Sequence, residues 1–381
     1  MIARDAAKTL RRLARGYPIV VIMGPRQSGK TTLAQTTFKG KAYVSLENPD
    51  ERAFAREDPR GFLARFRSGA IIDEAQHGPD IFSYLQTLVD AKRKPGLFVL
   101  TGSQNFGLLA RITQSLAGRV GIVHLLPLAI AELRNEGLLG RLDDVLYQGL
   151  YPALYDRKVK APDWYANYVM TYLERDVRQI ANIQDLSTLQ RFLKLCAART
   201  GQLLNIANLA VECGVAQGTA RSWLSVLEAS YIVHLLQPYH RNLGKRVVKT
   251  PKLYFCDTGL ACSLLSVQGS QHTAIHPHRA ALFETLVVAE LLKRRLNAGL
   301  RSNLYFWRDN IGTEVDVVIE EGLRLVPIEI KSGLTVNTDL LAPMTRWMKY
   351  AGAAAKTPTV VYGGGEAFTR SGARFVPWSE L

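Results

Sequence analysis

The chain has 381 residues, of which 47% are hydrophobic and 21% charged, so it is long enough for two or three packed domains and too apolar to be a disordered protein. Its formal net charge of +15 attracts polyanions, which makes nucleic acid the first partner to consider. No run is apolar enough to cross a bilayer and the first residues lack a secretory signal, so we expect a cytoplasmic protein with no membrane partner.

The first chemical motif follows a continuous apolar run, Pro18 to Met23, which is typical of a buried parallel strand. The next residues, GPRQSGKTT, fit the phosphate-binding pattern G-x-x-x-x-G-K-[ST] between a strand and a helix. We expect Lys30 to reach the β- and γ-phosphates of ATP and the Thr31 hydroxyl to ligate magnesium. The residues predicted to bind the nucleotide are Gly24, Pro25, Arg26, Gln27, Ser28, Gly29, Lys30, Thr31 and Thr32.

Two acids end the next apolar segment, AIIDEAQ at 70–76. Asp73 is placed to hold the metal ion, and Glu74 to polarise the attacking water. A further apolar strand, at 97–103, ends in small polar residues at the same predicted edge. With the candidates at 42–46 and 121–125, five strands alternate with helices, so residues 1–126 are predicted to form an α/β domain with a parallel sheet.

Several short segments carry a resemblance to a known family: the P-loop, DEAQ (73–76), TGS (101–103), SLAGR (115–119), QGLYPAL (148–154) and TYLERDV (171–177). Together they resemble a widespread prokaryotic group of predicted AAA+ type ATPases whose C-terminal half is a domain of unknown function. The resemblance implies ATP hydrolysis, with Ser103 on the sensor strand. It makes Arg119 a candidate for an arginine that senses the nucleotide or acts across a subunit boundary, as in a homo-oligomer; a surface salt bridge is the alternative role.

Residues 127–186 are predicted to form a helical lid or linker, and residues 187–262 a winged helix-turn-helix. Two short helices meet at a turn near Gly214, and a hairpin follows them whose basic tip includes Lys252. Polar side chains on the second helix and basic ones in the hairpin are the candidates for DNA contact: Gln217, Thr219, Arg221, Ser222, Arg241, Lys245, Arg246 and Lys249. The alternative is a winged helix that only packs neighbouring subunits in an oligomer.

The last region, residues 263–381, sets acids and a lysine on one face of a predicted hairpin at 313–332. With a turn at Glu321-Gly322, Glu314 lies opposite Glu329. Two opposed carboxylates need a nearby cation, and this favours magnesium or manganese. Pro327 departs from the pattern, because its missing N–H suits an edge or a bulge better than a central strand.

An amphipathic helix upstream places Glu284 on its apolar stripe, where a lone acid needs a partner. The set Glu284, Asp316, Glu329 and Lys331 resembles the PD-(D/E)xK nuclease fold. That resemblance implies that the acids hold a metal ion, that Lys331 positions or activates water, and that phosphodiester hydrolysis is the chemistry. A fold kept for gripping DNA or for docking is the alternative.

The leading functional hypothesis is a DNA-dependent ATPase that uses Mg-ATP to remodel or move DNA, with branched recombination or repair intermediates as candidate substrates. An ATP-operated switch in signalling or defence is the second hypothesis. An ATP-gated, metal-dependent DNA nuclease, using magnesium or manganese, is the third.

Overall fold

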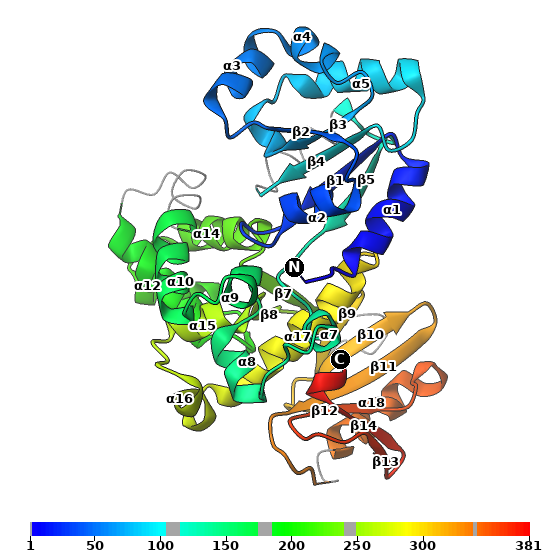
Figure 1. Cartoon of the computed structure of the whole chain (residues 1–381). Coiled ribbons are helices and arrows are strands. Elements are labelled where there is room, and N and C mark those ends of the chain that lie inside the picture. The colour runs from blue at the N-terminus through cyan, green and yellow to red at the C-terminus, as the bar shows by residue number, and fades with distance from the viewer. Residues whose placement is uncertain (1, 104–114, 174–184, 240–248, 338–340) are drawn as a thin grey trace.

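The structure is a computed structural model, and it describes residues 2–103, 115–173, 185–239, 249–337 and 341–381. Figure 1 shows an amino-terminal sheet with its helices, a largely helical middle region, and a carboxy-terminal sheet with helices beside it. In the described part of the chain, no helix combines the length and apolar character needed to cross a membrane.

The amino-terminal region is built on a parallel sheet in the order β2–β3–β4–β1–β5. The strands are β1 (Ile19–Met23), β2 (Ala42–Ser45), β3 (Ala70–Asp73), β4 (Phe98–Gly102) and β5 (Val120–His124). The helices described around it are α1 (Ala6–Gly16), α2 (Lys30–Thr37), α3 (Pro49–Glu57), α4 (Pro59–Ala64) and α5 (Ile81–Lys92). Apolar clusters fill both faces of this sheet, and β1 is at most 1% exposed. The predicted α/β class and parallel sheet are confirmed.

The middle region begins with a block of short helices. These are α7 (Ile130–Asn135), α8 (Leu142–Gln148), α9 (Pro152–Asp156), α10 (Ala161–Tyr168) and a π-helical turn at Val169–Leu173. The elements after the block are α12 (Leu186–Ala198), β6 (Gln202–Leu203), α13 (Ile206–Cys213), α14 (Gln217–Ala229), β7 (Val233–Pro238), β8 (Lys252–Phe255), α15 (Thr258–Leu264) and α16 (Ser270–Ile275). Gly214 ends α13 in the left-handed conformation at a φ of 73°, which lets α14 start three residues later.

The carboxy-terminal region extends the strands of the middle region into a single sheet. Its elements are α17 (Arg279–Asn297), β9 (Leu304–Arg308), β10 (Glu314–Glu321), β11 (Arg324–Lys331), α18 (Leu341–Ala351), β12 (Thr359–Tyr362), β13 (Phe368–Arg370) and β14 (Ala373–Pro377). The strand order is β13–β14–β12–β11–β10–β9–β7–β8–β6, with β7 parallel to β9. One sheet therefore crosses the border predicted at residues 262 and 263.

The β10–β11 hairpin has a different register from the predicted one. Glu320 pairs with Leu325, where the prediction paired it with Leu323. The turn lies one residue later, because Gly322, with a φ of +64°, takes its first position. A shift of two residues alone keeps each side chain on its predicted face, but β10 also carries a bulge between Val315 and Val318. As a result, Val315 and Val317 pack into different apolar clusters, where strict alternation would put them on one face. On its other side β11 pairs with β12 only from Ile328 onward, so Pro327 lies where no second strand needs its N–H.

A buried ion pair holds the start of the chain to the junction segment, residues 126–132, which follows β5. The side chains of Arg4 and Glu132 are 8% and 1% exposed, and 2.9 Å separates Arg4 Nε from Glu132 Oε2. The Arg4 guanidinium also donates to the carbonyl oxygens of Ser28 and Leu126, each at 2.7 Å. The Arg4 side chain thus holds both the P-loop and the junction segment that follows β5.

A second buried ion pair fixes the junction segment to α17. Glu290 Oε1 and Lys293 Nζ are 2.6 Å apart, and each side chain is 1% exposed. Glu290 accepts a hydrogen bond from the N–H of Ile130 at 2.7 Å, and Lys293 donates to the carbonyl of Leu128 at 2.8 Å. Both charges are therefore paired and hydrogen-bonded, which is the condition that burial of an ion pair requires.

We expect Lys293→Met to destabilise the protein by about 3–5 kcal/mol, because it leaves the Glu290 carboxylate buried without its cation. Arg294→Met is the matched control, since Arg294 is exposed on the same helix. Urea unfolding followed by circular dichroism measures both variants. Equal unfolding midpoints would show that the pair does not hold the junction.

Candidate functional site

The P-loop leaves the carboxyl end of β1 and enters α2, as the sequence predicted. Gly29 is left-handed at a φ of 91°, and a Cβ on Gly24 would lie 2.0 Å from the carbonyl oxygen of Leu125, so both positions need glycine. The Lys30 ammonium donates to the carbonyl oxygens of Gly24 at 3.1 Å and Pro25 at 2.7 Å. The nine residues predicted to bind a nucleotide form this loop and the first turn of α2.

The predicted metal ligands Thr31 and Asp73 are in contact. Thr31 Oγ1 donates to Asp73 Oδ1 at 2.6 Å, and Thr101 donates to the same oxygen. The Tyr43 hydroxyl donates to Asp73 Oδ2 at 3.1 Å. Burial and the Asp73 charge raise the pKa of Tyr43 to about 12, so the phenol stays a donor. No sequence pattern indicated Tyr43, because its contact with Asp73 depends on the pairing of β2 with β3.

Glu74 lies at the same edge and is 8% exposed. Its backbone is left-handed at a φ of 51°, a strained conformation that is found at functional sites. Ser103 Oγ donates to Glu74 Oε2 at 3.0 Å, and the Gln76 amide donates to the same oxygen. Burial acts to raise the pKa of Glu74, but the Lys30 charge and these two hydrogen bonds lower it below its usual value. The carboxylate is therefore ionised at neutral pH.

A cavity of about 470 Å³ opens beside the P-loop, between the start of the chain, α2 and the helices of the middle region. Gly29, Thr32 and Leu33 line one wall, and Arg4 and Pro152 line others. A hydrogen bond of 3.1 Å from Trp164 Nε1 to Gln27 Oε1 joins α10 to the loop as well. The middle region thus covers one side of the P-loop.

Arg119 lies away from these residues. It precedes β5, and its carbonyl accepts from the N–H of Ile19 at the start of β1, so it sits at the amino-end edge of the parallel sheet. The P-loop follows the opposite edge. Arg119 Nε and Nη2 donate to the two carboxylate oxygens of Asp90, at 2.6 and 2.8 Å. Within one chain the structure thus separates Arg119 from the P-loop and gives it a surface salt bridge.

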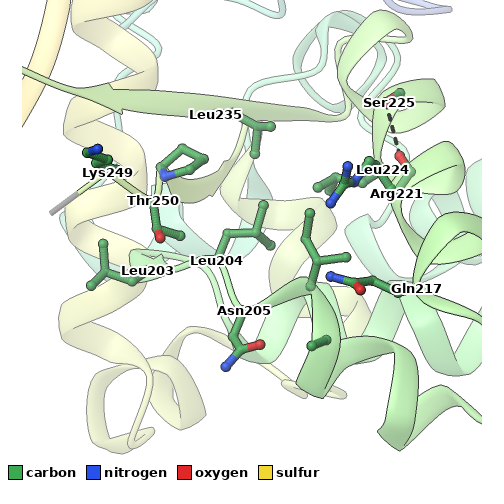
Figure 2. Close-up of a pocket in the computed structure, with 13 residues that line it drawn as sticks. Leu203, Leu204, Asn205, Gln217, Arg221, Leu224, Ser225, Leu235, Lys249 and Thr250 are labelled. Carbon is green, nitrogen blue, oxygen red and sulfur yellow. Dashed lines mark hydrogen bonds between the residues drawn. The ribbon is translucent and has the colours of Figure 1, made fainter.

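A groove of about 710 Å³ runs between α14 and the residues that lead into β8. Figure 2 shows Lys249 and Thr250 on one side, Arg221 and Gln217 on the other, and leucines between them. The structure thus brings together three of the predicted DNA contacts, together with Ser225. Thr219 is half-buried and Ser222 exposed on α14, but neither lines the groove; Arg241, Lys245 and Arg246 lie outside the described residues.

The predicted acids and lysine of the carboxy-terminal region gather around a residue that the prediction assigned to the hairpin tip. Lys252, at the start of β8, is 3% exposed. Its ammonium lies 3.0 Å from Glu284 Oε1 on α17 and contacts Glu314 on β10. Tyr254 donates to the same oxygen of Glu284. We call Lys252, Glu284, Glu314, Asp316, Glu329 and Lys331 the acid–lysine cluster.

The other half of the acid–lysine cluster is at β10 and β11. Asp316 Oδ2 accepts from the N–H of Ile330 at 2.8 Å, and Lys331 Nζ lies 2.8 Å from Glu329 Oε1. Burial, with Glu284 and Glu329 nearby, raises the pKa of Asp316 well above its usual value; burial also raises that of Glu329. Glu329 Oε2 is buried without a hydrogen-bond partner in the described residues.

The pairing within the acid–lysine cluster differs from the opposed carboxylates that the sequence predicted. Lys252 already pairs with Glu284, and the expected Glu314–Glu329 pair is replaced by separate ion pairs to Lys252 and Lys331. Across the described ranges, no group of three or more histidine, cysteine, aspartate or glutamate side chains is arranged to hold a metal ion. The predicted ligands Glu284, Asp316 and Glu329 are neighbours, but the cation beside Glu284 is an ammonium.

Three family models match consecutive parts of the chain. Residues 16–134 match an AAA domain, residues 139–271 a domain of unknown function (DUF8612), and residues 279–381 a second domain of unknown function (DUF4143). Among solved structures, the Walker-type ATPase paby2304 of Pyrococcus abyssi is similar over 69% of this chain and 96% of that one, at 15% identity and a TM-score of 0.46.

Two curated proteins are similar over most of their length. The uncharacterized proteins Rv2008c of Mycobacterium tuberculosis and Mb2031c of Mycobacterium bovis are each 36% identical over 332 residues, which cover 86% of this chain and 73% of theirs. The chain therefore belongs to the family of these two mycobacterial proteins, and its amino-terminal region is a P-loop domain of the AAA ATPase type.

Proposed function

We propose that the amino-terminal region hydrolyses Mg-ATP and that DNA bound by the middle region stimulates this activity. The observation that carries the ATPase half is the convergence of Lys30, Thr31, Asp73, Glu74 and Ser103 at one edge of the sheet, next to the P-loop. Hydrolysis of a phosphoanhydride needs a cation for the phosphates, ligands for magnesium and a base for water. These side chains supply all three.

Each side chain of the site has a distinct role in the proposed reaction. Lys30 exchanges the carbonyls of Gly24 and Pro25 for phosphate oxygens, which bind an ammonium more strongly. Thr31 and Asp73 would hold magnesium, whose charge offsets that of the phosphates. Glu74, ionised and held by hydrogen bonds, accepts a hydrogen bond from the attacking water and orients it. The buried Ser28 hydroxyl, which has no partner in the described residues, is available to a phosphate oxygen.

The cavity beside the P-loop is the proposed site of the nucleoside. It adjoins Gly29 and Thr32, so a nucleotide whose phosphates fill the P-loop directs its base and ribose there. Its 470 Å³ lies within the range of small-molecule sites in proteins. Because Arg4 and Pro152 line other walls, a nucleotide in this position contacts both the start of the chain and the middle region.

We expect Glu74→Gln to lower the rate of ATP hydrolysis by about 100-fold or more while leaving ATP affinity close to that of the wild type, because the amide keeps the shape but cannot take the proton. Lys30→Ala should instead weaken nucleotide binding. Phosphate release and binding of a fluorescent ATP analogue separate the two effects. Normal turnover in Glu74→Gln would remove this residue from the proposed chemistry.

The DNA half of the proposal rests on the middle region. Its element order α12–β6–α13–α14–β7–β8, with β6 and β7 both antiparallel to β8, supports the winged-helix prediction. In that arrangement α14 would be the recognition helix. The groove beside α14 carries Arg221 and Lys249 at its rim, suited to phosphates, and Gln217 and Ser225, suited to base edges. The chain's basic excess adds long-range attraction.

We expect DNA to raise the ATPase rate, and the double variant Arg221→Ala/Lys249→Ala to need several-fold more DNA for the same stimulation. The matched control Lys356→Ala/Arg370→Ala removes the same charge from exposed positions of the carboxy-terminal region. Titrations with single-stranded, duplex and forked DNA at two salt concentrations make the measurement. A rate indifferent to all three DNA forms would contradict the proposal and favour a nucleotide-operated switch.

A further inference from the structure

Lys252 belongs to the middle region, but its ammonium lies among acidic side chains of the carboxy-terminal region. It begins β8, in the middle region, whereas its partners Glu284 and Glu314 belong to α17 and β10. The Lys252 side chain crosses the face of the shared sheet, and its ammonium lies 5.7 Å from the centre of the Phe306 ring on β9. Phe306 is fully buried.

The surroundings of Lys252 satisfy a buried ammonium on several sides. Two carboxylates supply opposite charge, and the aromatic face of Phe306 adds a cation–π contact. Although burial works against the charged form, Glu284, Glu314 and Asp316 outweigh it and raise the pKa of Lys252 above its ordinary range. Glu284 and Glu314 thus have a cation within the chain, because the Lys252 ammonium contacts both carboxylates.

An ammonium and a divalent ion cannot occupy the same position between these carboxylates. A magnesium or manganese ion binds carboxylate oxygens at about 2.0–2.2 Å, and the Lys252 side chain excludes it from Glu284 and Glu314. We propose that Lys252 takes the place of the divalent cation, so that the acid–lysine cluster is a metal-free joint that fastens the winged-helix strands to α17 and β10.

The strongest argument for a metal ion in the acid–lysine cluster lies at its other half. There the Glu329 Oε2 atom is buried and unpartnered in the described residues, near Asp316. A divalent ion held in the acid–lysine cluster would use these two carboxylates. The decisive quantity is therefore the amount of manganese that the protein binds only when Asp316 is present.

The first experiment measures free Mn²⁺ by electron paramagnetic resonance during titration of nucleotide-free protein. Wild type and Asp316→Asn are compared, so that manganese held at the P-loop acids cancels in the difference. We expect the two curves to coincide. One additional equivalent of bound manganese in the wild type, lost in Asp316→Asn, would overturn the proposal. The readout does not depend on ATP hydrolysis or DNA binding, so a failed ATPase proposal leaves it intact.

The second experiment measures the joint itself. Lys252→Met should lower the thermal unfolding temperature by roughly 5 °C or more, because two carboxylates lose their cation, whereas Lys252→Arg, which keeps the charge, should fold. Lys356→Met is the exposed control. Addition of Glu284→Gln to Lys252→Met should restore part of the loss. A Lys252→Met protein as stable as the control would overturn the proposal; if that variant does not fold, the manganese comparison decides alone.

Discussion

The buried charges around the junction segment are the constraint on which the arrangement of the regions depends. Between Leu126 and Ile130 several backbone groups are satisfied by charged side chains from distant parts of the sequence. Arg4 comes from the start of the chain, and Glu290 and Lys293 come from α17. A buried peptide group that loses its partner costs about 1–3 kcal/mol, so these side chains fix the path of the segment.

The same side chains lie between the P-loop and the region proposed to bind DNA. Arg4 holds the carbonyl of Ser28 in the P-loop, and α17 carries Glu284 about 14 Å along its axis from Lys293. Helix α17 thus contacts the junction segment through Glu290 and Lys293 and belongs to the acid–lysine cluster through Glu284. Strand β8 joins that cluster through Lys252. A series of buried polar contacts therefore links the P-loop to the region proposed to bind DNA.

Local patterns predicted which side chains gather at the carboxyl edge of the parallel sheet, but they did not predict the long-range strand pairing. The P-loop, Asp73 and Glu74 are specified by residues within a few positions of one another at the ends of buried strands, and parallel strands bring those ends together. The hairpin register depended on which position of a two-residue turn Gly322 takes, and alternation constrains only its parity. Alternation also failed within β10, where a bulge between Val315 and Val318 sends Val315 and Val317 into different apolar clusters.

Lys252 and Arg119 show why a residue type alone does not reveal its role. Lys252 follows a basic stretch, so the sequence suggested that it contacts phosphate. The folded sheet instead places it beside acids more than thirty residues away in the sequence. Arg119 lies in a segment that resembles a family motif, but it precedes β5 and so falls at the edge away from the P-loop. Arg4 precedes every motif, and no pattern in the sequence distinguishes it from neighbouring arginines.

The charged residues buried in the core are mostly acids, and this affects how basic the surface of the protein is. Among the described residues, the buried charged side chains include three lysines but seven acids. Because acids outnumber lysines in the buried class, the exposed surface is more basic than the composition of the whole chain indicates. A field that draws in a polyanion arises from solvent-exposed charge, since buried pairs largely cancel at a distance. The exposed surface of the described residues therefore carries a larger share of the positive charge than of the negative charge.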